Sequence, residues 1–309
     1  MSTSSLIVVE SVPSRRGRLV ALLSAMRIRQ WSKNVLVVVA PAAAGVLTHR
    51  QVIIHTLIAF AAFCLAASGV YLLNDVVDIE ADRAHPEKHR RAIASGEIPV
   101  PAATVTGVAL IGAGLGVSVL SGSVALVVIL VVYAVNSIAY VAYVKQMPVI
   151  EMASVATGFF LRALAGAAAN HLYVSSWFLV VISFSAMFLV VGKRTAEKHR
   201  LGTTAGLHRA VLGEYSERFL NSALTMTATV VVTTYCLWAF DTSQSGLSNV
   251  HHNVTAIRLT VVPVVLAMLH VLRLLESGGG GAPEELVLSD RTVQVLGVVW
   301  AALLVVGIY

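Results

Sequence analysis

Long apolar segments alternate with short polar segments along most of the chain, and this pattern predicts membrane-crossing helices. Nine of the apolar segments have roughly the length of a bilayer-spanning helix, allowing for tilt and uncertain ends. They lie near residues 34–48, 52–73, 102–119, 123–144, 149–169, 175–192, 221–240, 256–275 and 291–309. The first is the weakest of the nine, because Pro41 interrupts it and Asn34 lies at its start. We expect an all-α protein in which about nine transmembrane helices form one bundle, with eight or ten as the nearest alternatives.

The composition excludes a soluble globular protein. Of the 309 residues, 57% are hydrophobic and only 12% are charged, and the mean hydropathy is +0.81. Cys64 and Cys236 are the only cysteines and both lie in apolar segments, so neither a disulfide framework nor a zinc site is expected. We expect a cytoplasmic N-terminal tail over 1–26, disordered over 1–14, and a single transmembrane catalytic domain over 27–309.

Positive charge is distributed asymmetrically between the polar segments. With the N-terminus in the cytoplasm, 19 of the 22 lysines and arginines fall on the cytoplasmic side, whereas Arg50 and Arg258 fall outside and Arg162 lies within an apolar segment. This predicts a multi-pass protein of the plasma membrane whose active site faces the cytoplasm. Anionic membrane lipids and a phosphorylated ligand then explain the net charge of +6 without nucleic acid. A homo-oligomer is compatible with the sequence, which leaves the oligomeric state open.

The polar segment after the second apolar segment begins with NDVVDIEAD at 74–82, which we call the acidic motif. On a helix, Asp75, Asp78 and Asp82 share one face, and Asn74 is one turn from Asp78. Carboxylates this close need a cation, and oxygen ligands without cysteine or histidine suit Mg²⁺ bound together with substrate phosphates. The acidic motif therefore predicts a site for Mg²⁺ and a diphosphate, with Asn74 and the three aspartates as ligands. The alternative is a solvated acidic helix end.

A cluster of basic residues follows the acidic motif immediately. We expect Arg83, Lys88 and Arg91 from this cluster to bind the phosphates of a substrate. The usual excess of lysine and arginine on the cytoplasmic side would also explain the basic residues, although not the aspartates. Carboxylates that can bind a metal ion, next to basic side chains that can bind an anion, indicate a phosphorylated substrate.

A second charged segment, GKRTAEKHR at 192–200, follows the sixth apolar segment, and we call it the basic motif. On a continuing helix Lys193 and Glu197 share a face and could bracket a magnesium-bound phosphate, with Arg194 beside them. The alternative is a helix end whose long side chains extend to the membrane surface.

Further polar residues are candidates for the same site. Lys33, Lys145 and Glu151 lie near the cytoplasmic ends of apolar segments and could complete a pocket. Arg162 lies well inside the fifth apolar segment, where a cation is costly and usually faces the bundle interior. We expect Arg162 to bind substrate. The alternative is a structural role as partner of Glu151 or of backbone carbonyls.

An N-D-x-x-D-x-x-x-D motif after the second of about nine spans, with another charged motif after the sixth, resembles the UbiA-type superfamily of intramembrane prenyltransferases. The resemblance runs along nearly the whole chain. It implies an all-helical bundle in which two cytoplasmic motifs face each other across a cavity and hold Mg²⁺ with the diphosphate of a polyprenyl donor. Most members carry a second aspartate-rich repeat where this chain has Lys193, Arg194 and Glu197. This departure disfavours a prenyl diphosphate donor.

Four short sequences resemble the branch of this superfamily whose donor is phosphoribosyl diphosphate (PRPP). They are RQWSKN at 29–34, YLLND at 71–75, DRAHP at 82–86 and GKR at 192–194. The resemblance implies Mg²⁺-dependent transfer of 5-phosphoribose from PRPP to decaprenyl phosphate or another polyprenyl phosphate. The product, decaprenylphosphoryl-5-phosphoribose, would be a precursor of the arabinose donor for cell-wall arabinogalactan. PRPP carries a 5-phosphate besides its diphosphate, and lysine and arginine in place of acids would supply the additional positive charge.

The same resemblance implies a role for each candidate residue. Asp78, Asp82, Asn74 and Asp75 would bind Mg²⁺ and the diphosphate, and Arg83, Lys88 and Arg91 would bind the donor phosphates. Lys193, Arg194 and Glu197 would close the pocket, and Lys33 would bind the acceptor phosphate. Asp78, Asp82, Lys193 and Glu197 are the expected catalytic residues. No nucleophile–base pair is expected, because a phosphate nucleophile is already ionised at neutral pH.

Two other functions compete with this one. A prenyltransferase that moves a polyprenyl group from its diphosphate to an aromatic acceptor would share the fold and the acidic motif, but predicts a second acidic cluster. A lipid or anion transporter would use Arg162 and the cytoplasmic charges as a substrate path, and predicts no magnesium-dependent chemistry.

Overall fold

The computed structural model describes residues 17–85, 87–202, 210–242, 253–277, 283, 286 and 289–309, and over these residues the chain is helical with no strand. Residues 1–14, for which we expect disorder, and Pro86 lie outside the described residues. Eight helical spans in the described part are long and apolar enough to cross a membrane. They are α3 (Arg50–Val77), α5 (Val100–Val119), α6 (Val124–Ala142), α7 (Ile150–Ala169), α8 (Ser176–Leu201), α11 (Glu217–Thr242), α12 with α13 (Val254–Leu259, Val261–Glu276) and α15 (Arg291–Ile308).

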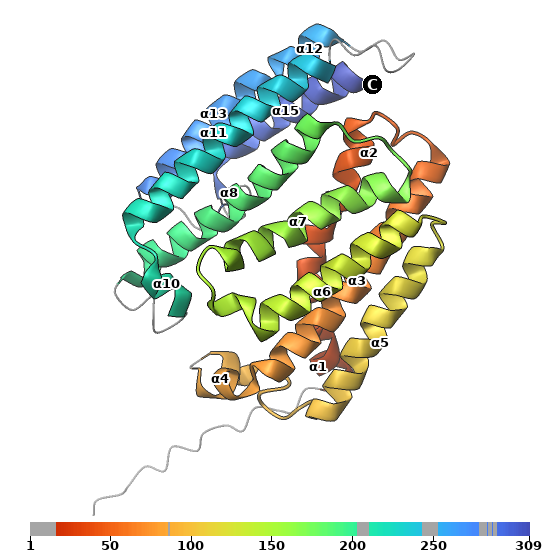
Figure 1. Cartoon of the computed structure of the whole chain (residues 1–309), viewed down its shortest axis with the longest axis vertical. Helices are drawn as coiled ribbons and strands as arrows, with labels where there is room; N and C mark the ends of the chain where they lie inside the picture. The colour runs from red at the N-terminus through yellow and green to blue at the C-terminus, as the bar shows by residue number, and fades with distance from the viewer. Residues whose placement is uncertain are drawn as a thin grey trace, which may run out of the picture.

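Shorter helices lie before the first of these spans and in the connections. They are α1 (Arg18–Ala25), η1 (Ile28–Val38), α2 (Val39–Ala43), α4 (Ile79–Ala84), η2 (Lys88–Arg90), η3 (Val144–Gln146) and α10 (Ala210–Glu214). The spans form two groups that meet where α7 packs against α8 (Figure 1). In one group α3 packs against α5 and α6, and in the other α8 packs against α11 and α13 against α15.

The outer faces of the spans are apolar. Large hydrophobic side chains such as Val105, Val128 and Val298 are more than half exposed, at 70%, 54% and 69%. Exposed apolar faces on closed helices suit lipid, because each helix satisfies its own backbone hydrogen bonds. The chain is a multi-pass membrane protein, as the sequence predicted.

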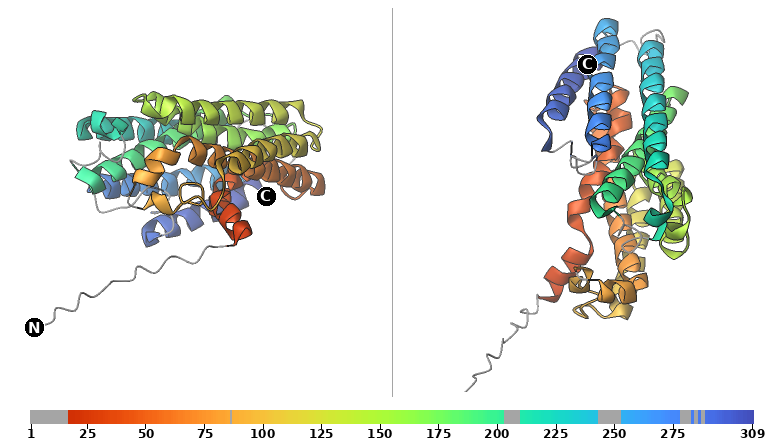
Figure 2. Two further views of the ribbon diagram at one scale, coloured as in Figure 1. Left: turned by 90° about the horizontal axis from the view of Figure 1, so that it is seen from below. Right: turned by 90° about the vertical axis from the view of Figure 1, so that its left-hand side faces the viewer.

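The structure differs from the prediction at the first expected span, near 34–48. That part of the chain is a 3₁₀-helix, η1, followed by the short α2, and Figure 2 shows it in red running lengthwise through the bundle. It is antiparallel to α3, because Trp31 Nε1 donates to Ser68 Oγ at 3.0 Å and Asn34 Nδ2 to Cys64 Sγ at 3.2 Å. A 3₁₀-helix rises faster than an α-helix, so its 11 residues and the 5 of α2 reach roughly 30 Å. A segment too irregular for the eight spans thus still traverses the bundle.

Glycine allows α7 to lie directly against this segment. A Cβ added at Gly166 would stand 1.8 Å from the carbonyl oxygen of Val37. We expect Gly166→Ala to lower the free energy of unfolding by roughly 1–3 kcal/mol or more, measured by thermal unfolding in detergent. Gly116→Ala in α5 is the control, because nothing lies within 4 Å of a Cβ there. Equal stability of the two variants would contradict this packing.

Candidate active site

The acidic motif begins in the last turn of α3 and continues into α4. The backbone remains helical across the junction, because Asp78 N donates to Asn74 O at 2.9 Å and Asp82 N donates to Asp78 O at 2.8 Å. Arg91 Nη1 lies 3.2 Å from Asp75 Oδ1 and 2.7 Å from Asp82 Oδ2. The carboxylates of Asp75 and Asp82 therefore share a face, as the spacing predicts.

Each aspartate of the acidic motif has a cation beside it. Asp75 also accepts from Arg27 Nη2 at 2.5 Å, and Asp78 pairs with Lys145. Asp75 and Asp82 are buried, whereas the side chain of Asp78 is 25% exposed. The cations come from the α1–η1 junction, the loop after η2 and the short helix η3, so three separate segments converge on the motif.

Arg27 is a site residue that the sequence did not single out. It joins α1 to η1 with a left-handed backbone, φ 52°, which is uncommon for a residue other than glycine. Its guanidinium lies 5.0 Å from the centre of the Tyr71 ring while it donates to Asp75. Strained backbone of this kind concentrates at functional sites. No local pattern could have revealed it, because its partner is 48 residues away.

Two of the basic residues predicted to bind phosphate make no ion pair with the acidic motif. Arg83 is exposed and its Nε donates to Ala94 O at 3.1 Å, which closes the loop after α4. Lys88 is half-buried, and its backbone N donates to His85 Nδ1 at 3.3 Å. Of the three basic residues expected to bind phosphate, only Arg91 contacts the carboxylates of the acidic motif.

The basic motif forms the cytoplasmic end of α8 and is tied to α7. Arg194 donates from Nε and Nη2 to the two carboxylate oxygens of Glu151, each at 2.8 Å, and from Nη1 to Glu197 at 2.8 Å. Glu151 and Arg194 are buried, at 0% and 3% exposure, whereas Lys193 is half-buried. Glu151, which the sequence offered as a structural partner of Arg162, thus forms its ion pair with Arg194 instead. This arrangement favours a structural role for Arg194 over the predicted contact with substrate.

A polar cavity of about 270 Å³ lies between η1, α3, α6 and α7, next to the acidic motif. Three cations line it, Arg27, Lys33 and Arg162, and Asn74 of the acidic motif lies in its wall. The remaining polar lining consists of amides and hydroxyls, from Asn136, Ser137, Ser154, Tyr71, Tyr133 and Tyr140. The cavity is therefore suited to an anionic, hydroxyl-bearing ligand.

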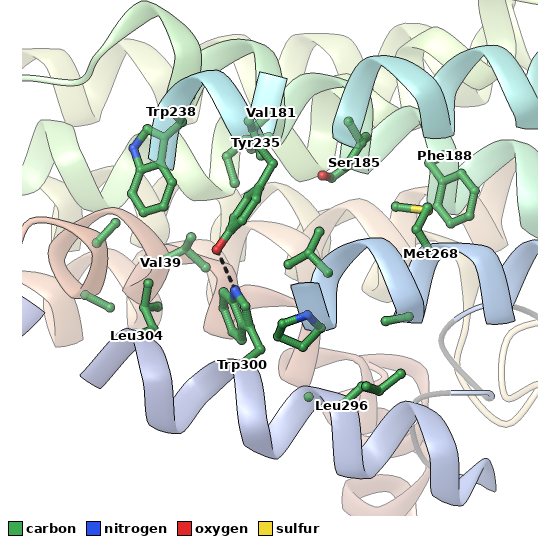
Figure 3. Close-up of a pocket in the computed structure, with 18 of the residues that line it drawn as sticks. Val39, Val181, Ser185, Phe188, Tyr235, Trp238, Met268, Leu296, Trp300 and Leu304 are labelled. Carbon is green, nitrogen blue, oxygen red and sulfur yellow. Dashed lines mark hydrogen bonds between the residues drawn. The ribbon is translucent and has the colours of Figure 1, made fainter. Parts of the chain in front are cut away.

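A larger, apolar cavity of about 690 Å³ lies on the other side of η1, between η1, α2, α8, α11, α13 and α15. Figure 3 shows Val181, Met268, Leu296 and Leu304 around it. Two of its few polar groups satisfy each other, because Trp300 Nε1 donates a hydrogen bond to the hydroxyl oxygen of Tyr235 at 2.7 Å. The cavity suits a hydrocarbon chain.

The segment η1 is the wall between the two cavities. Lys33 lines the polar cavity, and Val35, two residues later, lines the apolar one. Neighbouring residues of η1 therefore face a polar cavity on one side and an apolar cavity on the other.

The acidic motif fits a magnesium ion that is shared with a ligand. Asp75 Oδ1 and Asp82 Oδ2 converge on a point that one nitrogen of Arg91 already contacts. Within the described ranges, no three histidine, cysteine or carboxylate side chains could hold a metal ion by themselves. Mg²⁺ is usually bound through one or two carboxylates plus substrate phosphates. The donor set therefore suits Mg²⁺ together with a phosphorylated ligand.

Comparison with known families identifies the fold and the motif. Residues 35–277 match the UbiA prenyltransferase family. The chain belongs to the UbiA prenyltransferase family. The resemblance carried by the acidic motif is thereby confirmed, and the family covers most of the helical bundle.

Several relatives of this chain are named decaprenyl-phosphate phosphoribosyltransferase. One, from Corynebacterium glutamicum, is 41% identical over 294 residues, which cover 93% of this chain and 86% of the relative. Another, from Mycobacterium tuberculosis, is 38% identical over 289 residues, covering 91% and 92%.

Solved UbiA structures share the fold. A UbiA homolog from Archaeoglobus fulgidus bound to GPP and Mg²⁺ has a TM-score of 0.67, with 16% identity over 93% of this chain and 98% of that one. The same homolog bound to DMAPP and Mg²⁺ has a TM-score of 0.69, with 16% identity over 93% and 97%. The all-helical fold expected from the sequence is confirmed.

Proposed function

We propose that this protein transfers 5-phosphoribose from PRPP to decaprenyl phosphate, with release of diphosphate. The relatives named for this activity match nearly the whole chain. The observation that carries the proposal is the number of cations: Arg27, Arg91 and Lys145 pair with the three aspartates of the acidic motif, and Lys33 and Arg162 line the adjoining cavity in addition. A diphosphate with Mg²⁺ does not need so many cations, whereas a donor with a further phosphate does.

The donor diphosphate binds at the acidic motif. Asp75 and Asp82, with Asp78 and Asn74 beside them, would hold Mg²⁺ together with the diphosphate oxygens. The magnesium ion, when bound, neutralises charge on the leaving diphosphate. Arg91 and Lys145 already lie within ion-pair distance of these carboxylates and are in place to contact donor oxygens as well. The roles of Lys193 and Glu197 at the end of α8 remain predictions from the sequence.

The acceptor lies along the apolar cavity, with its phosphate at η1. A polyprenyl tail is apolar, and the larger cavity is lined by valine, leucine, phenylalanine and tryptophan side chains from six elements. Lys33 lines the polar cavity, and its contact with the acceptor phosphate stays a prediction from the sequence.

The chemical step follows from these positions. A non-bridging oxygen of the acceptor phosphate attacks the anomeric carbon of PRPP and forms the new C–O bond. The bond from that carbon to the diphosphate breaks, and the diphosphate leaves with the electron pair. No proton moves, because the phosphate nucleophile is already ionised, so the protein acts by positioning the substrates and neutralising their charge.

We place the site on the cytoplasmic side of the plasma membrane. Arg27, Arg91, Lys145 and Arg194 all lie at one end of the spans, and lysine and arginine collect on the cytoplasmic side of membrane proteins. PRPP as a soluble donor requires the same orientation. The oligomeric state stays open.

Transfer of label tests the proposed function. Purified protein is supplied with decaprenyl phosphate and PRPP labelled in the ribose, with Mg²⁺ present or chelated. We expect magnesium-dependent label in the lipid phase. Folded protein that leaves all label in the aqueous phase would contradict the proposal.

Narrowing the apolar cavity tests the position of the acceptor. Ala267 lines that cavity, so we expect Ala267→Phe to raise the KM for decaprenyl phosphate about tenfold, as a displaced tail loses contacts. The KM for PRPP should stay unchanged. Val262→Phe is the control on the same helix, because Val262 is 55% exposed. An unchanged acceptor KM in Ala267→Phe would place the tail elsewhere.

A further inference from the structure

Arg162 is a buried cation that no carboxylate neutralises in the part of the chain that the structure describes. It is 6% exposed, and its three hydrogen bonds go to neutral groups. Nε donates to Asn34 Oδ1 at 2.7 Å, Nη1 to Gly158 O at 2.6 Å and Nη2 to the Tyr133 hydroxyl at 2.9 Å. An uncompensated charge this deep in a membrane span is costly, and cations there usually serve a ligand.

The guanidinium of Arg162 is fixed and has donors left over. It has five N–H groups, of which the three bonds use one on each nitrogen. Its carbon Cζ lies 4.7 Å from the centre of the Tyr133 ring and 5.9 Å from that of Phe159, so aromatic contacts hold its position. The two remaining N–H groups belong to a side chain that lines the polar cavity. Two donors on a planar group fit two oxygens of a phosphate.

We propose that the polar cavity binds the ribose 5-phosphate half of the donor, with the 5-phosphate at Arg162. The inference rests on the proposed function, and it gives a binding site to the ribose 5-phosphate end of PRPP, which the acidic motif does not bind. Asn74 brings one end of the cavity to the acidic motif, whereas Arg162 lies deeper, because it is bonded to Asn34, which contacts α3 at Cys64 rather than near Asn74. Along α7 the lining extends from Ser154 to Arg162, about 12 Å, so a ligand with its diphosphate at the motif reaches Arg162 with its far end.

The middle of the cavity matches a sugar. Asn136 and Ser154 line it and hydrogen-bond to each other, Ser154 Oγ donating to Asn136 Oδ1 at 3.0 Å. Ser137 and Tyr140 add hydroxyls to the same wall. Amides and hydroxyls are the usual partners of ribose hydroxyl groups, because each can donate and accept.

The acceptor phosphate is the other phosphate monoester that could occupy this site, and the shape of the cavities disfavours it. A phosphate at Arg162 would bring its polyprenyl tail into a polar cavity of about 270 Å³, away from the apolar cavity beyond η1. The 5-phosphate carries no tail and meets no such conflict.

The same geometry explains selection against a prenyl diphosphate. With its diphosphate at the acidic motif, its hydrocarbon would lie against the Arg162 guanidinium and leave the two remaining N–H groups of this buried cation without an acceptor. A buried charge without a partner is strongly unfavourable, so the cavity rejects the apolar donor as well as favouring the charged one.

Binding of the two halves of the donor tests the assignment. Ribose 5-phosphate, magnesium pyrophosphate and farnesyl phosphate, a short analogue of the acceptor, are titrated separately against full-length protein in lipid nanodiscs. For Arg162→Gln we expect the affinity for ribose 5-phosphate to fall roughly tenfold to 100-fold, the effect of one charge-assisted hydrogen-bond pair, and that for pyrophosphate to stay within about twofold. Arg258→Gln, at an arginine that contacts Phe240 outside both cavities, is the control.

Each alternative outcome is distinct. Loss of both affinities would make Arg162 a structural residue and overturn the proposal. Unchanged binding of ribose 5-phosphate, with lost binding of farnesyl phosphate, would assign the cavity to the acceptor and also overturn it. If Arg162→Gln does not fold, Arg162→Lys carries the test, because it keeps the buried charge but loses the planar pair of donors; the affinity for ribose 5-phosphate should again fall while that for pyrophosphate stays. If the unaltered protein binds neither half of the donor, the proposed function itself fails.

Discussion

Asp82→Asn is expected to reduce phosphoribosyl transfer by at least about 100-fold while the protein stays folded, since one electrostatic contact to a reacting group typically contributes this much. Asp82 and Asp75 present converging oxygens, and replacing one carboxylate by an amide removes half of that anionic pair. Arg91 keeps its contact with Asp75, so the loop after η2 stays in place. Initial rates over a magnesium titration measure the effect, and the variant should need more Mg²⁺ for half-maximal rate.

Glu80→Gln is the matched control for this variant. Glu80 lies in the same short helix, α4, but is exposed. We expect it to retain its rate and its magnesium requirement. Equal rates of transfer by Asp82→Asn and Glu80→Gln would show that the acidic motif is not part of the active site.

Arg194→Met is expected to lower the free energy of unfolding by about 3–5 kcal/mol, because it removes the guanidinium that is paired with a buried carboxylate. Glu151 has no exposed surface and receives two of the hydrogen bonds of Arg194. Thermal unfolding in detergent measures the loss.

A double variant separates a structural role of Arg194 from a binding role. Glu151→Gln combined with Arg194→Met removes both charges and should recover part of the lost stability, since buried ion pairs can be replaced by neutral groups at little cost. If Arg194→Met instead folds normally and loses only affinity for PRPP, Arg194 contacts the donor, as the sequence suggested.

The long spans could be predicted from the sequence because their apolar length alone specifies them. Nothing in hydropathy distinguishes a 3₁₀-helix from an α-helix, so η1 was missed, although Pro41 marked the weak point of that segment. The close contact of Gly166 with Val37 depends on tertiary packing that no local pattern encodes.

The chemistry of the site could be predicted only where it is local. Helical spacing placed Asp75 and Asp82 on one face, because both belong to one short stretch of chain. Lys145 was a candidate for the pocket, but its pairing with Asp78 could not be foreseen, because the two residues are 67 positions apart. The spacing within the basic motif suggested Lys193 with Glu197, but it could not reveal that Arg194 would turn toward Glu151 on another helix. Long-range ion pairs follow from how helices pack, and that information lies outside any single motif.

The choice of donor is the central claim, and a competition in one preparation tests it most directly. Folded protein with Mg²⁺ is given PRPP and a prenyl diphosphate, each with a different label, together with decaprenyl phosphate and an aromatic acceptor. We predict that label from PRPP enters the lipid phase as decaprenylphosphoryl-5-phosphoribose and that the prenyl diphosphate is recovered intact. Consumption of the prenyl diphosphate with formation of a prenylated aromatic product, and no lipid label from PRPP, would contradict the account.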